Sequence, residues 1–136
     1  MKQFRADLHI HSRFSRATSK KLTPRHLAAW AEVKGLDVLG TGDCTHPEWL
    51  DELEDQLVED SQSGLFRLKD TTDLGKEIPR FEDTSMNGRA LFMLQGEISS
   101  IYKRGGKVRK VHNLVYMPTF EAARKFSKLT NFVAQR

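Results

Sequence analysis

The order of elements in the N-terminal third of the sequence limits the fold more than any other feature. Residues 4–10 alternate apolar and polar side chains, as a short strand does. A helix is predicted to begin at Thr23 and Pro24, an N-cap followed by a first-turn proline, and to end at Gly35. Residues 36–40 are predicted to form a second short strand. A strand, a helix and a strand in this order predict parallel strands joined by a right-handed crossover.

The rest of the sequence predicts a mixed α/β domain. Its expected elements are a helix over 47–58, strands at 65–68 and 90–95, hairpin arms at 98–103 and 107–117 around Gly105 and Gly106, and a last helix from 118 to about 129. Residues 70–88 are polar and are expected to have little regular structure. No repeat or low-complexity tract divides the sequence, so residues 1–136 are expected to form a single domain.

The composition is typical of a globular protein. Hydrophobic residues make up 38% of the chain and charged residues 29%. The apolar runs are too short to span a bilayer, and the first residues lack the apolar core of a signal peptide. The single cysteine, Cys44, excludes an internal disulfide framework. These features predict a cytoplasmic protein that does not bind a membrane.

Charge is distributed unevenly along the chain, whose net charge is +4. Residues 48–60 hold seven acids and no Lys or Arg, whereas residues 102–110 hold five basic residues and no acid. The five are Lys103, Arg104, Lys107, Arg109 and Lys110. Such a cluster attracts phosphate groups, including a nucleic-acid backbone. A solvated hairpin tip explains the same residues, and the sequence leaves both interpretations open.

The segment from Asp7 to His11, with the sequence Asp-Leu-His-Ile-His, is the strongest candidate for a functional site. Residues two apart on a strand point to the same side, so His9 and His11 can bind one metal ion together. Asp7 lies on that side too, where a carboxylate can orient a ligand through a hydrogen bond. The segment ends a predicted strand, and sites in parallel α/β folds gather at the carboxyl ends of strands.

Four further residues lie at or beside predicted strands and suit a metal site. They are Asp43, His46, Glu97 and His112. Imidazoles and carboxylates suit Zn, Mn or Fe ions, and a bridging carboxylate can hold two ions about 3.5–4 Å apart. Each residue type also has an ordinary explanation: Asp43 as a turn residue, Glu97 as a strand-end acid and His112 as a hydrogen-bonded strand histidine.

Four motifs in this sequence resemble those of a known family. They are Asp-Leu-His-Ile-His-Ser at 7–12, Gly-Thr-Gly-Asp-Cys-Thr-His-Pro at 40–47, Gly-Glu at 96–97 and Lys-Val-His-Asn at 110–113. Over about residues 4–120 the chain resembles the PHP (polymerase and histidinol phosphatase) family. The stretches 14–20, 30–31, 40–43 and 45–47 together resemble its endonuclease Q-like branch. The resemblance implies an α/β fold, a distorted (β/α)7 TIM-like barrel, and phosphoester hydrolysis with two or three divalent ions (Zn, Mn, Mg or Fe).

The resemblance also assigns roles to individual residues. His9 and His11 would bind the first metal ion. Glu97 would bridge to a second ion, which His112 would hold. Asp43 and His46 would belong to the remaining ion or its surroundings, and Glu97 and Asp43 are the expected catalytic residues. The basic residues from Lys103 to Lys110 would contact a DNA backbone, an inference that rests on their charge.

The sequence departs from the family pattern after His112. The family has further ligands there, another His and an Asp-X-His pair, whereas residues 113–136 contain no His and no Asp. A complete barrel also needs a longer chain. The sequence therefore matches the N-terminal part of a PHP domain. A partner chain or a C-terminal half is expected to complete the barrel and to cover its strand edges.

Three functions follow as hypotheses. The first is a metal-dependent DNA endonuclease of the endonuclease Q type, which by resemblance nicks on the 5′ side of deaminated bases such as uracil and hypoxanthine. The second is a phosphatase of the histidinol-phosphatase type, acting on a small phosphomonoester with the same ligands. The third is a non-catalytic fragment that binds metal or nucleic acid.

Overall fold

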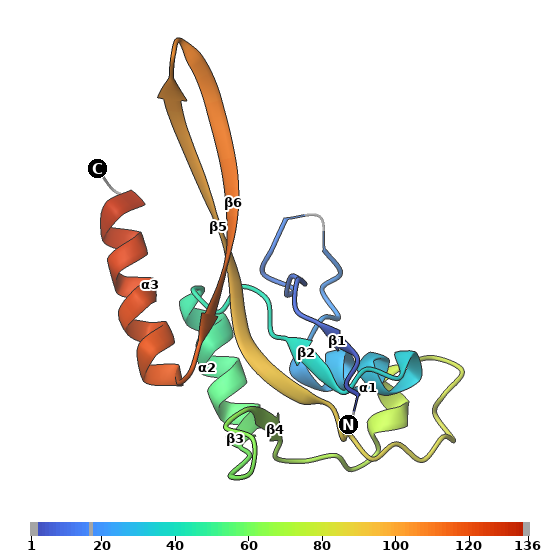
Figure 1. The fold of residues 1–136 in the computed structure, drawn as a ribbon. Coiled ribbons are helices and arrows are strands. Elements are labelled where there is room, and N and C mark those ends of the chain that lie inside the picture. The colour runs from blue at the N-terminus through green and yellow to red at the C-terminus, as the bar shows by residue number, and fades with distance from the viewer. Residues whose placement is uncertain (1–2, 17, 135–136) are drawn as a thin grey trace.

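The computed structural model describes residues 3–16 and 18–134, with side chains to residue 130. Its centre is a mixed sheet in the order β1-β2-β5-β4-β3, with β6 paired to β5 (Figure 1). The strands are β1 (Ala6–Asp7), β2 (Val38–Gly40), β3 (Leu57–Glu59), β4 (Phe66–Leu68), β5 (Leu91–Arg104) and β6 (Lys107–Met117). β1, β2 and β5 are parallel, as the strand–helix–strand order predicts, and β4, β3 and β6 add antiparallel pairs.

Among the described residues, three α-helices accompany the sheet: α1 (Pro24–Lys34), α2 (Pro47–Gln56) and α3 (Phe120–Ala134). The predicted caps of α1 are confirmed. The Thr23 side chain accepts a hydrogen bond from the His26 backbone N–H, and Gly35 takes the left-handed conformation with φ 66°. No described helix has the length and apolar character needed to cross a membrane.

The core lies between the sheet and the helices. Trp49, Leu50 and Leu53 of α2 are almost fully buried, as are Phe92 and Leu94 of β5. β5 therefore has a buried first half, which fixes its position before it reaches the polar residues that follow. The short 3-10 helix η1 (Leu74–Glu77) lies in the otherwise irregular segment 70–88.

Several predicted boundaries are wrong. β1 has two residues instead of seven, so His9 and His11 lie in the loop that follows it. α2 ends at Gln56, because residues 57–59 pair with β4 as β3. The predicted break after Gln95 is absent: β5 continues through Glu97 to the hairpin as one strand. α3 extends five residues beyond the predicted end at 129.

The sheet is open in the described part of the chain. Its order places β1 at one edge and β3 at the other. The closed barrel implied by the family resemblance is therefore not seen in these residues, although the parallel trio β1-β2-β5 agrees with the predicted α/β class.

Candidate metal centre

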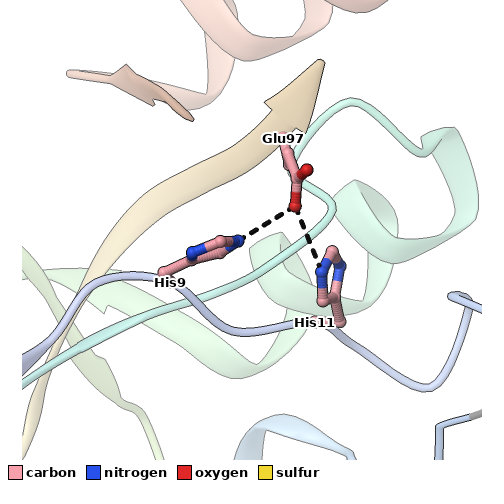
Figure 2. A group of neighbouring side chains, drawn as sticks. All are labelled: His9, His11 and Glu97. Carbon is pink, nitrogen blue, oxygen red and sulfur yellow. Dashed lines mark hydrogen bonds and ion pairs between the residues drawn. The ribbon is translucent and has the colours of Figure 1, made fainter. Parts of the chain in front are cut away.

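The parallel strands bring three segments together at one edge of the sheet. Asp7 is in register with Leu39, and Gly40 with Met93, so the residues that follow each pairing point lie side by side. His9 and His11 come from the loop after β1, and Glu97 from β5 (Figure 2). One ligand atom from each of these three side chains lies within 4.8 Å of the others.

Glu97 is the centre of this group. Its Oε2 lies 2.9 Å from His9 Nε2 and 3.3 Å from His11 Nε2 (Figure 2). Its other oxygen, Oε1, contacts His112 Nδ1 on the neighbouring strand β6. The Glu97 side chain is 12% exposed, while the three imidazoles are 41–55% exposed. One shielded carboxylate thus faces histidines on both sides, and the histidines are open to solvent.

Asp43 reaches this group through His11. Its Oδ2 accepts hydrogen bonds from the Ser12 backbone N–H and hydroxyl, at 2.7 and 2.6 Å. Its Oδ1 accepts from the Ser15 hydroxyl at 3.0 Å and lies 3.3 Å from His11 Nδ1. Burial alone would raise the pKa of Asp43, but the hydrogen bonds from Ser12, His11 and Ser15 leave this pKa below its ordinary value. An ionised Asp43 favours a proton on His11 Nδ1, which leaves Nε2 free to bind a metal.

Two other predicted residues are not part of the group. His46 is the N-cap residue of α2, and its ring stacks on Phe14 with 4.4 Å between centroids. The buried Nδ1 of His46 has no hydrogen-bond partner among the described residues. Asp7 accepts a hydrogen bond from the His9 backbone N–H at 3.3 Å and so supports the loop rather than an imidazole.

Gln95 is a residue of this region that sequence reasoning missed. Its side chain is fully buried, and its Oε1 lies 3.4 Å from the Ile10 N and 3.2 Å from the Gly42 N, both of which donate to it. One amide oxygen therefore ties the His9–His11 loop to the loop that carries Asp43. The signal was present in the sequence, because a polar residue inside the apolar strand 90–95 needs hydrogen-bond partners.

Gly42 allows the two loops to approach. It has φ 65°, and a Cβ at this position would lie 2.8 Å from the His11 Cα, closer than real contacts allow. Cys44 follows in the same loop and is buried; burial, and then the neighbouring Asp43 charge, raises the pKa of its thiol to about 12. A thiol with this pKa stays protonated near neutral pH in the metal-free chain.

The five basic residues lie on the outer part of the β5–β6 hairpin, and Lys110 comes two residues before His112 on β6. All five are exposed. The register pairs Lys103 with Val108, Arg104 with Lys107, and Ile101 with Lys110. Because paired residues share a face and faces alternate, Lys103 and Lys110 lie on the ribbon face that carries Glu97 and His112. Arg104, Lys107 and Arg109 lie on the opposite face.

Two solved structures are similar to this chain. The crystal structure of the lesion-specific endonuclease PfuEndoQ from Pyrococcus furiosus matches 95% of it, with a TM-score of 0.64 and 27% sequence identity. A structure of endonuclease Q in complex with a 27-mer duplex, with an abasic lesion at the active site, matches 92% of it, with a TM-score of 0.63 and 28% identity. The chain is endonuclease Q-like in structure.

Sequence comparison finds two uncharacterized proteins. YqxK of Bacillus subtilis is 33% identical over 135 residues, and MJ0043 of Methanocaldococcus jannaschii is 52% identical over 48 residues. No protein-family model matches the chain. The chain spans only part of all four proteins: 30% of YqxK, 6% of MJ0043, and 26% and 25% of the two endonuclease Q chains.

Proposed function

We propose that this chain carries the first part of the active site of a metal-dependent DNA endonuclease of the endonuclease Q type. The observation that carries the proposal is Glu97, whose two oxygens face His9 and His11 on one side and His112 on the other. The structural similarity to a lesion-specific endonuclease supports DNA as the substrate class. Deaminated bases are the proposed lesions, in line with the family resemblance of the sequence.

The donor set fits divalent ions. Imidazole nitrogens and a carboxylate suit Zn, Mn or Fe, and Mg where oxygen ligands dominate. His9, His11 and Glu97 would hold one ion, and the second oxygen of Glu97 with His112 would favour a second. Such ions, when bound, polarise a phosphoryl oxygen and neutralise charge that develops on the leaving oxygen. Asp43 would hold His11 in position, and His46 would contribute to the surroundings or to a further ion.

The remaining ligands and the rest of the barrel are proposed to come from a C-terminal half or a partner chain. An apolar cavity of about 490 Å³ lies between α1 and the N-terminal segment, lined in part by Leu27, Leu36 and Leu39. It lies beside β1, the edge strand of the open sheet. An additional strand or helix at this edge would cover both features.

The test is cleavage of a duplex that contains uracil or hypoxanthine, in the presence of Mn, Mg or Zn. The chain is assayed alone and within a longer protein that includes it. Nicking is expected to need an added ion and to be lost in Glu97→Gln, because the amide cannot serve as an anionic bridge. The matched control Glu59→Gln, on the exposed side of β3, should nick like the wild type. Nicking that survives Glu97→Gln, or none with any ion in either protein, would contradict the proposal.

The small-molecule phosphatase uses the same ligands, so ion dependence does not separate the two functions. The hairpin does separate them, since a small substrate bound at the ions does not need the charges of Lys107 and Arg109. Hydrolysis of a phosphomonoester that is unaffected by loss of Lys107 and Arg109, with no nicking of DNA, would favour the phosphatase.

A further inference from the structure

The outer half of the β5–β6 hairpin contacts little of this chain. From Ser99 to Leu114 every residue is exposed. The backbone ladder nevertheless continues to the tip, where Arg104 pairs with Lys107. Figure 1 shows the two strands extending well beyond the helices. A long ordered ribbon of this kind leaves both of its faces available to a partner outside the described residues.

Both faces of this ribbon carry the same kind of side chains. On the face of Glu97 lie Lys103 and Lys110, with Ile101 and Val108 beside them. The opposite face carries Arg104, Lys107 and Arg109, with Tyr102. No acidic residue occurs between Glu97 and Glu121, and none of the five cations forms an ion pair with a described residue. A ribbon that lay flat on a polyanion would need cations on one face only.

We propose that the tip of this hairpin enters the major groove of duplex DNA and contacts the phosphates of both groove walls. The major groove is about 12 Å wide and admits a two-stranded β-ribbon. A ribbon inside it has a phosphate backbone on each side, which matches cations on both faces. The exposed apolar side chains Ile101, Tyr102 and Val108 would meet base edges and thymine methyl groups. The inference rests on the proposed function and specifies how that site holds its duplex.

The length of the ribbon sets where the contact falls. Glu97 and Arg104 are seven residues apart on one uninterrupted strand, which corresponds to about 23 Å. Along a duplex this distance is about seven base pairs. The phosphates protected by the hairpin should therefore lie no more than about seven base pairs from the nicked bond.

The experiment compares two double variants that each remove two charges, one pair from each face. Lys103→Gln/Lys110→Gln acts on the Glu97 face, and Arg104→Gln/Lys107→Gln on the other. Lys76→Gln/Arg80→Gln, in the segment that contains η1, removes the same net charge away from the hairpin and is the control. The probes are a uracil-containing duplex and the same strand unpaired, with binding measured over a range of salt concentrations.

Both hairpin variants are expected to weaken duplex binding by about tenfold or more near physiological salt and to lower the salt slope by about two. The control should bind like the wild type, and the unpaired strand should respond less to either hairpin variant. A loss confined to one face would overturn groove insertion in favour of flat contact. Wild-type binding by both variants, or equal losses with the unpaired strand, would overturn it as well.

The two proposals fail in different ways. Cobalt binding, measured by absorption spectroscopy, should be the same in all three variants, because the substituted residues lie outside the His9–His11–Glu97 group. If the wild type nicks DNA in an ion-dependent way and both hairpin variants bind duplex normally, only the proposal of groove insertion by the hairpin is overturned. If duplex binding depends on the cations of both hairpin faces but no nicking occurs with any ion, only the proposed endonuclease activity is overturned.

Discussion

Gln95 shows how much the candidate site depends on a residue that would not itself touch the ions. Its Oε1 accepts from the backbone N–H groups of Ile10 and Gly42, and Glu97 follows two residues later on the same strand. One buried side chain therefore sets the distance between the three segments that supply or support the ligands.

Gln95→Leu should loosen both loops while keeping the side-chain volume. We expect faster amide hydrogen exchange at Ile10 and Gly42 in the metal-free chain, and metal affinity lower by about tenfold or more. Gln56→Leu on α2 is the control, since the Gln56 Oε1 has no hydrogen-bond partner among the described residues. Unchanged exchange at both amides in Gln95→Leu would show that other contacts hold the loops.

Asp43→Asn should change the tautomer of His11. The two hydrogen bonds from Ser12 keep the amide oxygen at the Oδ2 position, so the new NH2 group faces His11 Nδ1. The imidazole must then accept at Nδ1 and carry its proton on Nε2, the atom that faces Glu97. Metal affinity, measured by calorimetry, is expected to fall by about 10–100-fold. Asp60→Asn is the control, because Asp60 accepts from Ser63 in a similar way at an exposed turn.

The lowered pKa of Asp43 adds a pH dependence to this prediction. A carboxyl whose pKa is lower in the folded state stabilises the fold above its ordinary pKa of about 3.9. This contribution is lost as the pH falls through the lowered folded value. The difference in unfolding free energy between wild type and Asp43→Asn should therefore shrink in acid, and a difference that grows in acid would contradict it.

At the scale of elements, two glycines make a matched pair. Gly42 and Gly35 both have positive φ, 65° and 66°, so alanine costs about 1–2 kcal/mol of backbone strain at either. A Cβ on Gly35 would meet only the Arg5 Nη1 at 3.9 Å, whereas a Cβ on Gly42 would collide with the His11 backbone. Gly35→Ala should lose stability in denaturant and keep its metal affinity. Gly42→Ala should lose both stability and metal affinity. Equal metal affinity in the two variants would contradict the view that the close approach of Gly42 to the His11 backbone supports the site.

The sequence predicted the kind of most elements better than their ends. Helix α1 was predictable because Thr23, Pro24 and Gly35 are local signals. β3 was not, because Leu57 continues the apolar stripe of α2 and is buried in either conformation. Its pairing with β4 decides the outcome, and that pairing is a tertiary contact. For the same reason, the β6 partner that keeps β5 extended through Gly96 and Glu97 could not be read from β5 alone.

The candidate site was only partly predictable, because local residue types can be read from the sequence whereas tertiary contacts cannot. His9, His11 and Glu97 stood out as residue types near strand ends, and the structure brings these three side chains together. Gln95 did not stand out, because its contacts join segments more than fifty residues apart in sequence. Whether Asp43 and His46 serve as ligands stays a prediction.

At the scale of the whole molecule, the open edge of the sheet has a measurable effect. The Arg5 carbonyl accepts from the β2 side, so the backbone groups of Ala6, its neighbour in an alternating strand, point to the free edge. We expect the isolated chain to self-associate as its concentration rises, measured by sedimentation velocity. Ala6→Pro should reduce this association, because proline removes the edge N–H without breaking the pairing with β2. A monomer at all concentrations would contradict the expectation.

The hydrogen bonds from Ile10 and Gly42 to Gln95 also determine how the chain would respond to a chelator. Small zinc domains unfold without their ion because the ion is what gathers the ligands. Here the ligand loops are held by buried amide hydrogen bonds and a packed strand, so the folded shape does not require an ion. Ions could then be removed and replaced at equilibrium, and the metal that fills the site in a cell would be set by supply as much as by the protein.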